Sequence, residues 1–163
     1  MTQQLTLAPG DPVVYPKHGA GVVRGVTERT ALGHTQPYYD IELRASGMQV
    51  LVPVGRAHDL GLRRVTPEQD IPTLLSALGA PDLDLPAGFP PRIRAEQAVV
   101  ESADIVEIAR LVGTLARRHV SRGLADSEHQ LMRQAKHTVT TEVAVSLGVG
   151  DDEAGRLVDA RLP

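Results

Sequence analysis

The stretch Gly10-Asp-Pro-Val-Val-Tyr-Pro-Lys-His-Gly-Ala-Gly-Val-Val-Arg24 decides the fold of the first part of this chain. Two β-branched apolar runs flank a loop of Pro, Lys, His and Gly, which is typical of two short strands joined by a turn. An Asp-Pro entry and a Gly-x-Gly turn fit a small curved sheet. The stretch therefore predicts β-structure near the N-terminus.

The same pattern continues to residue 65. Short apolar runs between Gly, Pro and polar turns predict strands at residues 12–15, 21–27, 38–43, 48–53 and 62–65. In the third of these runs Tyr39, Ile41 and Leu43 alternate with Asp40 and Glu42, so one face of the strand is apolar. This spacing predicts a small bent sheet or half-barrel of the Tudor or SH3 kind.

After Thr66 the hydrophobic period becomes helical. Pro67 is read as the first residue of a helix that Gly79 ends, and residues 79–91, rich in Pro, Gly and Asp, read as an extended connection. The apolar residues of that helix are Ile71, Leu74, Leu75 and Leu78. A β domain over residues 1–66 and an all-α domain over residues 67–163 are therefore predicted, which makes an α+β protein.

Two further helices have local start signals. Asp104 and Glu107 have the spacing of a capping box, which predicts a helix to Arg122, and Asp126 or Ser127 caps the next. The predicted buried faces are Ile105, Ile108, Leu111, Val112, Leu115 and Ala116 in the first, and Leu131, Met132, Ala135, Val139, Val143 and Leu147 in the second. Asp151 and Asp152 favour a short last helix.

Charge is divided unevenly along the 163 residues. Residues 1–66 carry seven Lys/Arg against five Asp/Glu, and residues 67–163 carry ten against fifteen, so the two parts have net charges of +2 and −5. Non-specific DNA affinity comes mainly from neutralised phosphates. The acidic second part therefore argues against strong DNA binding without a partner.

Several classes of protein are disfavoured. The first ten residues have neither the basic nor the apolar region of a secretory signal, so we expect no membrane association and a cytoplasmic protein. The glycines from Gly19 to Gly25 are followed by β-branched residues rather than a helix, which rejects a dinucleotide-binding turn. There is no cysteine, and none of the six histidines forms an i, i+4 zinc pair with a carboxylate nearby. We expect no enzymatic activity, no cofactor and no metal.

The opening motif closely resembles the start of the CarD family of bacterial transcription regulators, whose first domain is shared with transcription-repair coupling factors. The second half is similar to that family too, in the Leu-Pro segment from Leu85 to Phe89 and the Arg-Gly-Leu helix break at residues 122–124. The resemblance implies that the β domain binds the RNA polymerase β subunit. It also implies that the helical domain lies on promoter DNA at the upstream fork junction of the transcription bubble.

This resemblance implies particular polymerase contacts. Docking by strand addition needs an exposed sheet edge with apolar side chains, and Val50, Leu51 and Val52 are the candidate edge. Without the resemblance these three would be read as ordinary core residues. Arg29 matches a position where the family uses Arg against the polymerase, and otherwise reads as a solvated turn residue. At Leu51 relatives carry Arg, which implies a smaller polar contact here.

The implied DNA contacts begin at Phe89, where family members commonly have a Trp wedge at the junction of duplex and bubble. A Phe can wedge but lacks the indole N–H. From sequence alone a single Phe is more often a core residue. Arg92 and Arg94 follow and are expected to bind flanking phosphates. The remaining candidates, which share one helical face and also fit a solvated surface, are His129, Arg133, Lys136 and His137.

The expected function is that of a monomeric regulator that joins the polymerase and stabilises the open promoter complex. Weaker DNA-contact candidates are Arg110, Arg117, Arg118 and Arg122, which also suit helix C-termini. Two alternatives stay open: a polymerase-tethered adaptor whose helical domain recruits another protein, and a stand-alone nucleic-acid-binding barrel.

Overall fold

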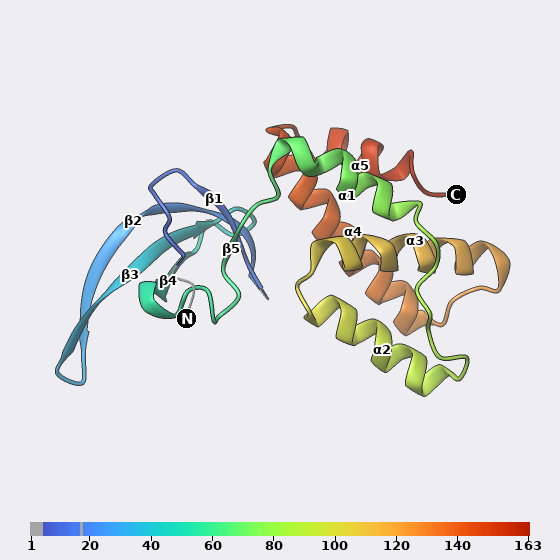
Figure 1. The fold of residues 1–163 in the computed structure, drawn as a ribbon, viewed down its shortest axis with the longest axis horizontal. Coiled ribbons are helices and arrows are strands. Elements are labelled where there is room, and N and C mark those ends of the chain that lie inside the picture. Colours follow the sequence, from blue (N-terminus) through green and yellow to red (C-terminus); the bar gives the residue numbers. More distant parts are fainter. Residues whose placement is uncertain (1–4, 17) are drawn as a thin grey trace. The chain divides into compact units, whose positions relative to one another are not determined.

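The computed structural model describes residues 5–16 and 18–163. The chain forms two compact units, Met1–Val65 and Thr66–Pro163. The first is built on a β-sheet and the second consists of helices (Figure 1). The α+β fold class predicted from the sequence is therefore confirmed.

The sheet of the β unit has five antiparallel strands in the order β4-β3-β2-β1-β5. They are β1 (Pro12–Tyr15), β2 (Gly19–Ala31), β3 (His34–Leu43), β4 (Gln49–Pro53) and β5 (Arg63–Arg64), with a 3₁₀ turn η1 (Val54–Arg56) after β4. The sheet is strongly curved (Figure 1). Its register shifts between Val23 and Gly25, a β-bulge that sharpens the twist.

Alternate strand positions supply the core of this unit. Its buried members are Leu7, Val13, Val23, Tyr39, Ile41, Leu43, Val52, Ala57 and Leu62. Tyr39 also fastens the segment before β1, because its hydroxyl donates to the Leu5 carbonyl at 2.8 Å and accepts from the Leu7 N–H at 3.1 Å. The apolar alternation predicted for β3 is therefore confirmed.

Beyond the core, β2 and β3 continue as a hairpin arm. The sequence predicts strands only up to Thr27 and from Tyr38, whereas residues 28–37 are paired throughout the arm except at its turn. Those residues are all exposed and mostly polar, so they lack the alternation that marks a half-buried strand. The arm turns at Leu32 and Gly33, with φ angles of 52° and 76°, the two-residue geometry of a tight hairpin.

The helical unit begins with a 3₁₀ turn and contains five α-helices among the described residues. They are η2 (Glu68–Asp70), α1 (Ile71–Leu78), α2 (Phe89–Glu101), α3 (Ile105–Ser121), α4 (Asp126–Leu147) and α5 (Asp151–Asp159). Gly79 caps α1 as predicted, but the helix begins at Ile71 and not at Pro67, which lies before η2. Gly148 ends α4 with a left-handed φ of 67°, which glycine adopts without a Cβ penalty.

The predicted caps are confirmed in part. The Asp104 carboxylate accepts from the N–H groups of Val106 and Glu107, but Glu107 pairs with Arg110 at 3.0 Å instead of completing a capping box. Neither Asp126 nor Ser127 caps α4, because the helix begins one residue earlier than expected. Ala125 is the N-cap there, and its N–H donates to the Glu128 carboxylate at 3.3 Å.

The core of the helical unit lies chiefly between α1, α3, α4 and α5. Its buried residues include Ile71, Leu74, Leu78, Ile108, Val112, Ala135, Val139, Val143 and Val158. Five residues predicted to be buried are only half-buried, namely Ile105, Ala116, Leu131, Met132 and Leu147. α1 and α3 approach closely at Gly113, where an added Cβ would lie 2.0 Å from the Leu78 carbonyl oxygen. Arg117 fixes the following connection by donating to the carbonyls of Leu78 and Ala80 and pairing with Asp82 at 2.6 Å.

Candidate functional site

The predicted polymerase-binding edge is a true edge of the sheet. β4 lies at one end of the strand order and pairs with β3 alone among the described strands. Val52 is buried and Val50 packs against the core, whereas Leu51 is 38% exposed on the opposite face. The expectation that all three side chains line a docking surface is therefore corrected, because the pleat sends Val50 and Val52 inward.

Backbone pairing singles out Leu51 as well. The Leu43 N–H donates to the Met48 carbonyl at 2.8 Å, so hydrogen-bonded pairs on this ladder alternate from there and Leu51 falls opposite Asp40 in a non-hydrogen-bonded pair. The N–H and C=O of Leu51 consequently point away from β3. A strand added at this edge would meet both groups.

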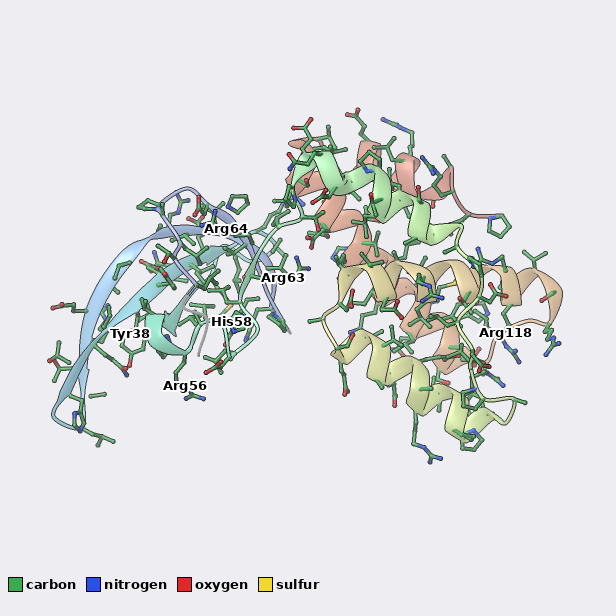
Figure 2. All side chains as sticks on the ribbon, in the orientation of Figure 1. Tyr38, Arg56, His58, Arg63, Arg64 and Arg118 are labelled. Carbon is green, nitrogen blue, oxygen red and sulfur yellow. The ribbon has the colours of Figure 1, made fainter. Side chains whose placement is uncertain are left out.

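Arg29 shares a face of the sheet with Leu51. Arg29 pairs across the arm with Gln36, whose amide donates to the Tyr38 hydroxyl at 2.9 Å, and Asp40 pairs with Leu51 on the same face. Tyr38 is labelled on β3 in Figure 2. Arg29 is exposed. The sheet register therefore brings two of the residues predicted for polymerase binding onto one surface.

Phe89 is the first residue of α2 rather than part of a loop. Gly88 is its extended N-cap, and Pro90 and Pro91 occupy the first turn, where their missing N–H groups leave no internal hydrogen bond unmade. The ring is 42% exposed, and the Arg92 guanidinium carbon lies 5.7 Å from its centroid. A cation over the ring face favours one ring orientation.

Arg92 is not available to bind phosphate, which corrects the sequence-based expectation. It is only 7% exposed. Its Nε and Nη2 donate to the two Glu128 oxygens at 3.1 and 3.0 Å, and its Nη1 donates to the Ala87 carbonyl at 2.8 Å. These hydrogen bonds to Glu128 raise the pKa of Arg92 further. Arg94, by contrast, is exposed and makes no ion pair with the described residues.

The second predicted basic patch is mostly committed to internal contacts. The His129 ring packs edge-on against His119 with centroids 4.8 Å apart, and Lys136 pairs with Asp159 at 2.5 Å. Arg133 and His137 are exposed on α4. Of the two predicted basic residues Arg133 and Lys136, it is therefore Arg133 that is exposed and available to bind an external anion.

Two buried carboxyls beside Arg92 were not found from the sequence. Glu96 is 0% exposed and Glu128 is 1% exposed. The Arg92 guanidinium lowers the pKa of Glu128, whereas burial, together with the nearby Glu128, raises the pKa of Glu96 to about 8. Arg92 and Glu96 at i, i+4 look like a surface ion pair in sequence, so the signal was present but pointed to solvent.

Comparison with known proteins gives the family. Residues 7–66 match the CarD-like/TRCF RID domain, and residues 73–159 match the CarD C-terminal domain. The chain therefore belongs to the CarD family of transcription factors, as the resemblance in the sequence indicates. Within the described residues there is no cluster of three or more potential metal ligands, and no helix has the length and apolarity to cross a membrane.

Individual relatives are similar over different parts of the chain. The chain is 26% identical over 144 residues to "Putative transcription factor YdeB" of Bacillus subtilis (strain 168), covering 88% of this chain and 94% of that protein. The N-terminal domain of Myxococcus xanthus CarD is 30% identical over 39% of this chain and 84% of its own, with a TM-score of 0.32. The corresponding values for CdnLNt of Myxococcus xanthus are 29%, 40%, 92% and 0.32.

Proposed function

We propose that this protein binds the RNA polymerase β subunit through its β unit and stabilises the open promoter complex through its helical unit. The contact with DNA would lie at the upstream edge of the bubble. Family membership over both units supports the proposal. The observation that carries it is that the half-exposed Phe89 ring, at the start of α2, packs against the buried guanidinium of Arg92.

The mechanism is preferential binding to melted DNA. A ligand shifts the equilibrium between closed and open complexes only by the ratio of its affinities for the two. An apolar ring can occupy the space beside unstacked bases at a fork junction but finds no such space in intact duplex. A difference of about 1–3 kcal/mol would shift the equilibrium roughly five- to 150-fold.

Electrostatics make polymerase tethering necessary in this proposal. The helical unit has a net charge of −5, and Arg92 and Lys136 are engaged internally. The exposed cations that remain among the predicted DNA-binding residues are Arg94, close to Phe89 in α2, and Arg133 on α4. Few phosphate contacts mean weak free binding, so a tether that raises the local concentration supplies the affinity.

The docking half of the proposal uses β4. The outward backbone groups of Leu51 would pair with a polymerase strand, and Arg29 would add a charge contact on the same face. In this proposal the protein acts as a monomer. It is placed in the cytoplasm and at the nucleoid because its partner is the polymerase. Arg29→Glu should then reduce co-purification with polymerase, and unchanged recovery would move the docking surface elsewhere.

The direct test is Phe89→Ala in a reconstituted initiation system with purified polymerase. The variant should bind polymerase normally while the open complex dissociates faster after competitor challenge. Phe89→Trp is the matched control, because it keeps the ring and should preserve or lengthen the lifetime. An Ala variant with the lifetime of the unmodified protein would remove Phe89 from the mechanism.

An adaptor function is the second candidate, favoured by the acidic helical unit. In that case the helices would recruit another protein and would not touch DNA. Crosslinking from position 89 in the promoter complex separates the two, since DNA adducts at the fork support the first function and adducts only to protein support the adaptor.

A further inference from the structure

Two carboxyl side chains meet inside the helical unit and share a single guanidinium. Glu96 on α2 and Glu128 on α4 are both fully buried, and Arg92 on α2 lies between them. Arg92 forms a bidentate pair with Glu128, whereas its Nε is 3.8 Å from a Glu96 oxygen, too far for a hydrogen bond. Arg92 therefore hydrogen-bonds to Glu128 but not to Glu96.

Hydrogen-bond accounting isolates Glu96. Glu128 accepts from Arg92 at both oxygens and from the Ala125 N–H as well. Both Glu96 oxygens are buried, and no donor among the described residues bonds to them. The neighbouring Glu128 carboxyl contributes to the raised pKa of Glu96, and a hydrogen bond between two carboxyl groups needs a proton on one of them. The one hydrogen bond open to Glu96 therefore requires a proton of its own.

Charge accounting gives the same answer. The charged groups that face Glu96 are Arg92 from its own helix, Glu128 from α4 and Arg118 from α3. Arg118, labelled in Figure 2, forms no ion pair with Glu96, and its Nε is buried without a partner. With both carboxylates ionised, Glu96 would be a buried charge without a hydrogen bond beside a like charge, with only the 3.8 Å approach of an Arg92 guanidinium that already binds Glu128, which is unfavourable. Neutralising Glu96 removes that cost.

We propose that Glu96 is a neutral carboxylic acid that donates a hydrogen bond to Glu128, and that this shared proton fixes α2 against α4. We call Glu96, Glu128 and Arg92 together the clasp. Arg92 also packs against the Phe89 ring, so the shared proton helps to position the predicted DNA wedge. Glu96 is a positioning residue because it acts through Arg92 and Glu128. The consequence for DNA rests on the proposed function, whereas the shared proton does not.

The proton on Glu96 should stabilise the folded protein more at low pH than at high pH. The pKa of Glu96 is higher in the folded protein than in the unfolded chain, so its protonated form is favoured by folding. The stability that this proton gives is fully present below about pH 4.5 and is lost progressively as the pH rises to about 8. The clasp should therefore loosen on the alkaline side, which is opposite to the usual behaviour of a salt-bridged carboxylate.

The first test needs neither polymerase nor DNA. The ¹³C carboxyl resonance of Glu96 in the full chain should titrate well above the ordinary range of a glutamate, and an ordinary titration would overturn the proposal. Glu96→Gln keeps a donor to Glu128 and has no proton to lose. Its urea midpoint should vary less with pH than that of the unmodified protein between about pH 6 and pH 9, and equal slopes would overturn the shared proton.

Glu101→Gln is the matched control, since Glu101 is exposed on the same helix and its change should leave the slope intact. The second test compares open-complex lifetimes. At each pH the open-complex lifetime with Glu96→Gln is divided by the lifetime with the unmodified protein, so that the pH response of the polymerase itself cancels. This ratio should rise about fivefold between about pH 6 and pH 9. A constant ratio would overturn the positioning role, while failure of Phe89→Ala to shorten the lifetime would instead reject the proposed function.

Discussion

The Arg92 guanidinium lies 5.7 Å from the centroid of the Phe89 ring while donating to both oxygens of Glu128. One side chain thus joins the exposed start of α2 to the buried Glu128 in the first turn of α4. Because Arg92 is held by contacts within the protein, we expect it to orient the ring rather than to bind DNA. Sequence proximity to Phe89 predicted the opposite assignment, a direct phosphate contact.

Arg92→Ala should destabilise the protein by about 3–5 kcal/mol, because removal of one partner leaves buried charge without compensation. Urea unfolding at neutral pH measures this loss. Arg110→Ala is a suitable control, since its ion pair with Glu107 is partly exposed and should matter by less than about 1 kcal/mol. Similar losses in the two variants would contradict the clasp at α2.

Arg94→Ala should leave folding unchanged and weaken the promoter contact. The side chain is exposed and makes no ion pair with the described residues, so only an external phosphate would lose a partner. The salt dependence of promoter-complex formation should flatten by roughly one phosphate contact. A variant with an unchanged salt slope would place Arg94 away from DNA.

Leu51→Pro tests strand addition at the β4 edge. Proline removes the Leu51 N–H, which points away from β3, so the existing ladder loses no hydrogen bond at this position. Polymerase binding should fall sharply while circular dichroism stays that of the folded protein. Leu51→Ala, which keeps the N–H, should bind nearly normally. Equal binding by both variants would show that docking does not use this backbone edge.

Leu32→Asn should stabilise the hairpin arm by roughly 1 kcal/mol. Leu32 has a left-handed φ of 52° and is fully exposed, so its conformation costs energy and no contact offsets it. Asparagine tolerates this region of backbone space. Leu32→Ala retains the cost and should show no gain in thermal unfolding. If both variants gain alike, the turn geometry is not the cause.

Acid should weaken the protein through Glu128. Its pKa is lowered in the folded state by Arg92, so the stability from this pair is present above about pH 4.5 and is lost as the pH falls towards about 2. Urea midpoints between about pH 3 and pH 7 measure this loss. Glu128→Gln should lower the neutral-pH midpoint and flatten the acid limb, whereas an unchanged acid limb would show that another carboxylate governs it.

Local signals in the sequence predicted much of the architecture. The β1 strand, the Gly79 stop and the Asp104 cap are confirmed, because each depends on residues within one turn or strand. The arm at residues 28–37 was missed, since its strands are held by each other and not by a buried face. The start of α2 at Phe89 was also missed, because prolines in a first helical turn resemble a loop.

For the candidate sites, too, the sequence predicted some features and the tertiary structure decided the others. The family resemblance implied an apolar edge at residues 50–52, but only sheet order and register decided that Leu51 faces outward and that Arg29 shares its surface. The composition by itself determined that the helical unit has a net charge of −5, which argues against strong binding to free DNA. The tertiary structure alone decided that Arg92 is internal and pairs with Glu128 beside Glu96, because Arg92 and Glu128 are 36 positions apart and are brought together only by helix packing.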